Sequence, residues 1–164
     1  MFQLIVAVIS IALVAALAIA SIFYGGEAFT KSSDKAHVTA LVNQAQQISG
    51  AYQLYKTDNG TAPATIADLV SGGYLASLPT PPKVAADGAA WELDATTIDL
   101  GNGVAPVAKI IVNAPDADEG ICVEVVRQAG GTVNGNTVEA ADNPQFGCVS
   151  DEGDPAEVTF AFKL

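Results

Sequence analysis

The chain has 164 residues, half of them hydrophobic, and a formal net charge of −11 at pH 7. This length fits one globular domain together with an N-terminal helix. Residues 1–86 hold four acidic and four basic side chains, whereas residues 87–164 hold fourteen acidic and three basic ones. An acidic surface repels phosphate backbones, so the C-terminal half is not expected to bind nucleic acid, and the charge also keeps an exposed domain soluble.

The first 24 residues contain no charged side chain. As a helix they span about 36 Å, which is enough to cross the ~30 Å hydrocarbon core of a bilayer. A secretory signal peptide carries basic residues ahead of a shorter apolar core, but here no Lys or Arg precedes Lys31. We therefore expect a retained hydrophobic helix over residues 1–26, and we expect that a basic leader once preceded Met1.

Two glycines, Gly25 and Gly26, end this apolar segment. A glycine destabilises a helix by about 1 kcal/mol relative to alanine. The pair therefore marks either a break in the helix or a flexible joint, at the point where the chain leaves its apolar surroundings.

A second helical pattern extends over residues 27–57. Its apolar residues recur at alternating steps of three and four, which is typical of a helix with one packed face. The apolar positions are Val38, Leu41, Ala45, Ile48, Tyr52 and Tyr55. The other face is polar and consists of Asn43, Gln44, Gln46, Gln47 and Gln53. We expect an amphipathic half-helix that ends near Gly60 and packs on a globular head, residues 58–164.

The head begins with a predicted short helix over residues 65–70, which Gly72 and Gly73 would end. Short apolar runs between turn residues then predict strands over residues 90–93, 107–112, 121–127 and 157–164. Residues 129–148 are predicted to form a long, weakly structured excursion. We expect an α+β fold, in which the long N-terminal helix packs on a C-terminal antiparallel sheet.

The chain has two cysteines, Cys122 and Cys148, and one histidine, His37. These are too few for a structural zinc site, while a free pair of thiols or a two-ligand metal site stays open. In an exported domain a disulfide is the expected state. The sequence contains no P-loop, dinucleotide-binding or zinc-protease motif, so we expect neither enzymatic activity nor a cofactor.

The order of these features resembles that of the type IV pilins and the related pseudopilins. The most specific match is Leu69-x-x-x-Gly73-Tyr74-Leu75-x-x-Leu78-Pro79, which is similar to the segment after the long helix in many of these proteins. The likeness extends over the whole chain in architecture, and over the first 80 residues in motifs.

Two further features support the resemblance. The cysteines Cys122 and Cys148 resemble the pair that bounds the D-region of pilins, and Met1 suits the type IVb branch. The resemblance implies a structural subunit of an extracellular pilus-like filament with a role in cell adhesion, assembled by helical packing of N-terminal helices. Before assembly the subunit would lie in the inner membrane among lipids, where a prepilin peptidase and an assembly platform would act on it, with methylation of its N-terminal amine.

Two alternatives stay open. One is a minor pseudopilin of a type II secretion or DNA-uptake apparatus. The other is a single-pass, membrane-anchored binding module.

The chain departs from the family at position 5, where pilins normally carry a glutamate that resembles a counter-ion for the N-terminal amine of a neighbouring subunit. This position is Ile5, and no shift of one residue restores a carboxylate. A buried, unpaired ammonium is costly. Either Gln3 takes over the missing role by hydrogen bonding, or Gln3 only happens to lie at this end; Met1, Gln3 and Ile5 are the expected assembly residues, together with Gly25 and Gly26.

Two acidic segments are calcium candidates, because pseudopilins of secretion systems can bind calcium through acidic loops. The candidate ligands are Asp116, Asp118 and Glu119 in one segment and Asp151 and Asp154 in the other. Neither segment matches an EF-hand loop, which ends in a glutamate. Solvated surface turns are the competing interpretation.

Overall fold

The structure is a computed structural model that describes residues 2–101, 103–114, 120–134, 137–150 and 158–164, with the backbone alone at residues 23–31 and 137–138. The chain divides into two compact units, Met1–Ala36 and His37–Leu164. The first unit consists of the N-terminal part of helix α1 (Phe2–Asn59). The helix is continuous at Gly25 and Gly26, so no break occurs there, and a flexible joint stays a prediction.

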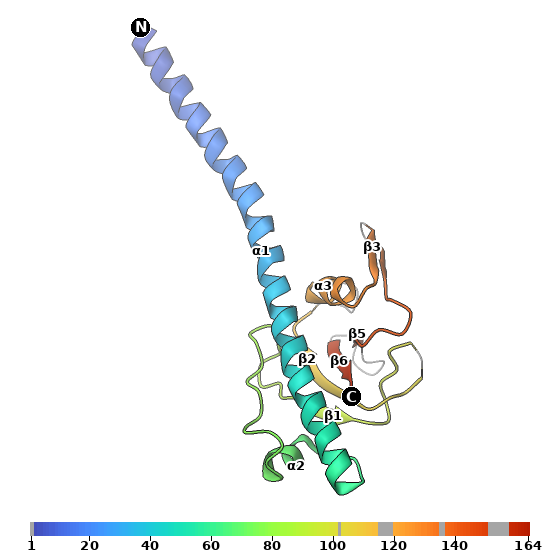
Figure 1. The fold of residues 1–164 in the computed structure, drawn as a ribbon. Helices are drawn as coiled ribbons and strands as arrows, with labels where there is room; N and C mark the ends of the chain where they lie inside the picture. The colour runs from blue at the N-terminus through green and yellow to red at the C-terminus, as the bar shows by residue number, and fades with distance from the viewer. Residues whose placement is uncertain (1, 102, 115–119, 135–136, 151–157) are drawn as a thin grey trace. The chain divides into compact units, whose positions relative to one another are not determined.

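In its described residues, the second unit combines the C-terminal part of α1 with two short helices and two antiparallel sheets (Figure 1). The larger sheet has the order β1-β2-β6-β5, and its strands are Glu92–Asp94, Val107–Val112, Val158–Lys163 and Phe146–Ser150 in that order. The smaller sheet pairs β3 (Thr132–Asn134) with β4 (Thr137–Glu139). An apolar N-terminal helix and a C-terminal antiparallel sheet confirm the predicted α+β layout.

Helix α2 (Ile66–Ser71) agrees with the prediction for residues 65–70. Thr65 precedes it in an extended conformation, and its backbone N–H donates to the Asp68 carboxylate at 2.8 Å. This contact satisfies one of the donors at the start of the helix. Gly72 caps the C-terminal end, and Gly73 follows with a φ of +77°, a conformation that glycine adopts without strain.

The segment predicted as a strand over residues 121–127 is instead helix α3 (Ile121–Gln128). Its buried apolar residues have helical spacing and are Ile121, Cys122, Val125 and Val126. Arg127 and Gln128 donate to the Glu124 carboxylate from three and four residues away, at 2.6 and 3.0 Å. The strand prediction is wrong. A short apolar run is compatible with a strand and with a helix, and only side-chain pairs three and four residues apart distinguish the two.

Residues 129–148 are more ordered than predicted, because they contain β3, β4 and the start of β5. Helix α3 contacts all three of these strands and lies beside β3 in Figure 1. The backbone at Gly131 lies close to both β4 and α3, which leaves no room for a side chain there. A Cβ at this position would lie 2.4 Å from the carbonyl oxygen of Glu139 and 2.5 Å from the side chain of Val126.

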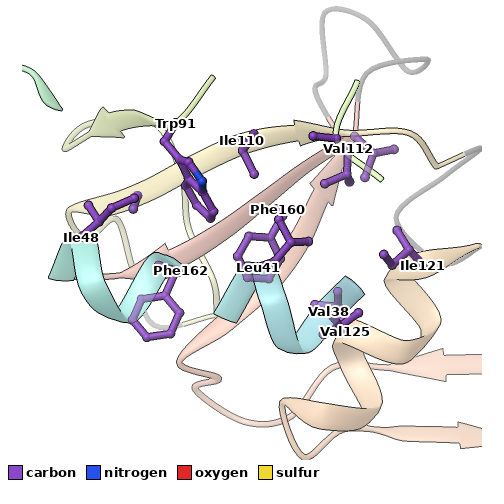
Figure 2. Close-up of a cluster of buried hydrophobic side chains, with 14 of the residues drawn as sticks. Val38, Leu41, Ile48, Trp91, Ile110, Val112, Ile121, Val125, Phe160 and Phe162 are labelled. Atoms are coloured by element: carbon purple, nitrogen blue, oxygen red, sulfur yellow. The ribbon is translucent and has the colours of Figure 1, made fainter. Parts of the chain in front are cut away.

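The main core lies between α1 and one face of the larger sheet. Figure 2 shows Leu41 of α1 close to Phe160 of β6, with Trp91 and Ile110 beside them. The apolar stripe of α1 is buried as predicted at Val38, Leu41, Ala45, Ile48 and Tyr52. Burial of this stripe is the largest favourable term available to hold a helix on a sheet.

The opposite face of the larger sheet is also partly covered. Ala161 points away from Phe160 and Phe162 by strand alternation, yet its exposed fraction is 0%. It belongs to a second apolar cluster formed by Ile98, Leu100, Val107 and Ala161, with Val149 packed against it. The segment between β1 and β2, which contains Ile98 and Leu100, therefore covers part of this second face.

Candidate functional site

The clearest candidate for a functional feature is an apolar helical segment that no other part of the described chain covers. Phe2–Ile22 is a stretch of 21 residues with a mean hydropathy of 2.9, none of it buried within the structure. Its length and composition alone are those of a membrane span. Large side chains are open along it, including Phe2 at 82% and Ile22 at 75% exposure.

The polar side chains of this segment fall into two kinds. Ser10 Oγ donates to the carbonyl oxygen of Val6, and Ser21 Oγ donates to that of Leu17, both at 2.8 Å. The hydroxyl groups of both serines thus have hydrogen-bond acceptors within their own helix, so they need no partner from outside it. Gln3 is exposed, and its side chain makes no hydrogen bond to any residue that the structure describes.

The predicted assembly residues at the start of the chain are placed only in part. Ile5 is 55% exposed on α1, one turn or less from Gln3. Met1 lies outside the described residues. Gly25 and Gly26 are helical.

Small residues follow one face of the apolar segment. Ala12, Ala16 and Ala20 are spaced four apart, and they lie above one another on the exposed helix. This spacing lets two helix backbones approach closely in an apolar environment.

The predicted disulfide is present between Cys122 and Cys148. It joins the first turn of α3 to β5, an edge strand of the larger sheet, over a sequence separation of 26. Cys122 is fully buried and belongs to the main core. The bond thus anchors α3, and with it the region from β3 to β5, to the rest of the head.

A cavity of about 210 Å³ lies beside this disulfide. Its wall includes Phe146 and Cys148 of β5, Val126 of α3, and Pro144. Asp99 is the single ionisable side chain among the lining residues, and its Oδ1 already accepts the backbone N–H groups of Gly101 and Gly103. The cavity therefore lacks the converging polar groups that are typical of a catalytic pocket.

The calcium candidates Asp116, Asp118, Glu119, Asp151 and Asp154 all lie outside the described residues. Within the described ranges, His, Cys, Asp and Glu side chains form no group of three that could hold a metal ion. His37 lies on α1 and does not line the cavity beside the disulfide.

Asp94, a carboxylate that lies in no recognised motif of the sequence, is held by several donors. Asp94 at the end of β1 accepts the backbone N–H groups of Thr96 and Thr97 at 2.9 and 3.0 Å, the Thr97 hydroxyl, and Lys109 Nζ at 3.0 Å. Partial burial by itself raises the pKa of Asp94, but these donors outweigh it and hold the pKa well below its usual value. Asp94 therefore fixes the turn after β1.

Tyr74 attaches the segment after α2 to the end of α1. The Tyr74 hydroxyl donates to the Asp58 carboxylate at 3.3 Å and accepts from Asn59 Nδ2 at 3.1 Å. The ring of Tyr74 meets that of Tyr55 edge to face, with centroids 5.2 Å apart. This tyrosine thus connects the segment after α2 to the last turns of the long helix.

In comparisons with known proteins, no family model, curated protein or solved structure matches this chain.

Proposed function

We propose that this chain is the structural subunit of a type IV pilus-like filament, in which the N-terminal helices of many copies pack together. The observation that carries the proposal is the apolar helix Phe2–Ile22, none of which is buried within its own chain. The pilin-like segment from Leu69 to Pro79 supports it. Inner-membrane residence before assembly and an extracellular filament afterwards belong to the same proposal.

The apolar helix has two environments in which its side chains avoid water. One is the bilayer, where a single subunit waits, and the other is a bundle of identical helices. Transfer between them exposes little apolar surface to water, so assembly does not meet a large hydrophobic penalty. Ala12, Ala16 and Ala20 offer a face on which such helices pack closely.

The head is acidic, so charge repulsion limits how closely the heads of neighbouring copies approach one another. Residues 37–164 hold sixteen acidic and five basic side chains, so they carry the whole net charge of −11. Repulsion between exposed charges is screened beyond about 8 Å at physiological salt. Neighbouring heads therefore tolerate one another if their charged surfaces stay about that far apart.

Electron microscopy of material sheared from cells tests the proposal. We expect filaments that contain this chain in abundance and persist without detergent. A chain found only in detergent extracts of membranes, at low copy number, contradicts the proposal and favours a minor pseudopilin or an anchored binding module.

A packing variant makes the test specific to the helix bundle. Ala16→Ile keeps the segment apolar but prevents close approach of two backbones, so we expect the chain to stay in the membrane and the filament yield to fall. Leu13→Ile, on the same segment, is the matched control and should leave the yield unchanged. Equal yields for both variants would contradict assembly through this face.

A further inference from the structure

A long part of α1 in the head carries no charge at all. From residue 38 to residue 55 there is no Asp, Glu, Lys or Arg, although residues 37–164 carry a net charge of −11. The buried stripe that contains Leu41 and Ile48 explains the apolar half of this stretch. The exposed half needs a different reason, because surface helices usually carry charged residues on the solvent side.

The exposed half forms a continuous surface, which we call the amide face. It consists of Asn43, Gln46, Gln47, Gly50, Gln53, Leu54 and Thr57, all of them exposed. At 3.6 residues per turn these positions fall within an arc of about 120° and extend along about 21 Å of helix. Leu54 is 53% exposed there, although it is a large apolar residue.

The amides of this face have no partner in the part of the chain that the structure describes. Asn43, Gln46, Gln47 and Gln53 make no side-chain hydrogen bond to a described residue. Gln44, one position away, is held on both ends of its amide group. At Gly50 an added Cβ would meet no atom within 4 Å, so the backbone is open to close approach.

The charge of the head and the chemistry of the amides indicate which partner binds the amide face. Two copies of this acidic head repel one another wherever their carboxylates meet, and the uncharged face is where they approach without that repulsion. A basic partner would be drawn instead to exposed carboxylates such as Asp87 and Glu92. Primary amides donate and accept, so an amide surface is complementary to a second copy of itself.

We propose that the amide face of one copy packs against the amide face of a second copy, with the two helices running in the same direction. This inference rests on the proposed function, because the two copies are those of one filament. The face is about 21 Å long and about 10 Å wide, the width of a helix, so it covers about 200 Å² per copy. This is well below the ~800 Å² that a stable pair of proteins buries on each side. The contact therefore forms only where the apolar helices already hold the copies together.

Paired charge variants of the full chain, expressed in cells, test the inference. Asn43→Glu with Gln47→Glu places two carboxylates on the face, and Asn43→Lys with Gln47→Lys places two ammonium groups there. We expect each variant alone to lower the filament yield by about tenfold, because like charges then meet. Co-expression of the two variants should restore the yield, since opposite charges face each other in mixed filaments.

The matched control carries Ala90→Glu and Ala95→Glu, at exposed positions outside the amide face. It adds the same charge and should leave the yield unchanged. The emission of Trp91, which is 2% exposed, checks that every variant chain keeps the head folded.

Three results would overturn the inference. Wild-type yields from both charge variants show that the face meets nothing, while the proposed filament stands. A normal or raised yield of the lysine variant beside a failing glutamate variant shows that the face meets an acidic surface instead of its own copy. If the unmodified chain forms no filaments, both the proposed function and the proposed contact are wrong.

Discussion

Trp91 is joined to α1 through Gln44, because its indole Nε1–H donates a hydrogen bond of 2.9 Å to Gln44 Oε1. The amide nitrogen of the same Gln44 donates to the carbonyl oxygen of Thr80 at 2.8 Å. One side chain thus connects the long helix both to the residue before β1 and to the proline-rich segment after α2. Trp91 also packs edge to face on Phe160, with ring centroids 6.1 Å apart.

We expect Gln44→Leu to lower the free energy of unfolding of the head by about 1–3 kcal/mol, because it leaves the buried indole N–H without an acceptor. The measurement is urea unfolding of the full chain in detergent, followed by emission of Trp91, the only tryptophan of the chain. Gln46→Leu makes the same change on the exposed face and should stay within about 0.5 kcal/mol of the unmodified chain. An equal loss in both variants contradicts a role for the hydrogen bond.

We expect Asp94→Asn to lower the free energy of unfolding by about 1–3 kcal/mol at pH 7, because charge-assisted bonds from Lys109 and the Thr97 hydroxyl are lost. The pKa of Asp94 is lower in the folded than in the unfolded chain, so its contribution is complete above the ordinary carboxyl pKa. It is lost as the pH falls below about 4 towards the folded-state pKa.

The loss caused by Asp94→Asn should therefore shrink between pH 5 and pH 2.5, values that bracket the ordinary aspartate pKa of about 3.9. Urea midpoints at the two pH values give this comparison. Asp87→Asn is the control, since the exposed Asp87 makes no hydrogen bond to a described residue. A loss that does not change with pH would mean that the effect of Asp94→Asn does not come from its charge.

Removal of the disulfide should destabilise the head by about 3.5 kcal/mol in the chain-entropy model, since the closed loop spans a sequence separation of 26. The variant carries Cys122→Ser and Cys148→Ser, and the measurement is again urea unfolding. A reducing agent should bring the unmodified chain to the same stability and leave the double variant unchanged. Equal stabilities of the double variant and the oxidised, unmodified chain would contradict this expectation.

Gln3→Leu should lower the filament yield, because Gln3 is the polar side chain near the N-terminal amine that has no described partner. Gln3→Glu should assemble at least as well as the unmodified chain, since a carboxylate accepts from an ammonium more strongly than an amide does. Yields are compared in the sheared fraction by microscopy and immunoblotting. If Gln3→Leu assembles as well as the unmodified chain, Gln3 does not take over the role of the missing glutamate.

The strongest periodic patterns predicted the fold well. The predicted strand over residues 107–112 coincides with β2, and the apolar stripe of α1 is buried from Val38 to Tyr52. The disulfide was also predictable from the number of cysteines. These features are local or compositional, so they need no knowledge of what lies across the core.

Long-range partners set the limits of that prediction. Gln44 was assigned to the solvent face, and its partner Trp91 lies 47 residues away in sequence. The apolar run predicts a strand where helix α3 lies, although the pairing of Glu124 with Arg127 is a helical signal. Asp94, with Thr96 and Thr97 two and three residues after it, was a readable turn signal as well.

The order of strands in the larger sheet has a consequence for how the head is made. β6 is the latest of the four strands in sequence, yet it lies between β2 and β5. In a chain that emerges from its N-terminal end, one edge of β2 and the facing edge of β5 therefore stay unpaired until Val158 and the residues after it arrive. Sheet closure is then a late and non-local step, during which two open strand edges require protection from other chains.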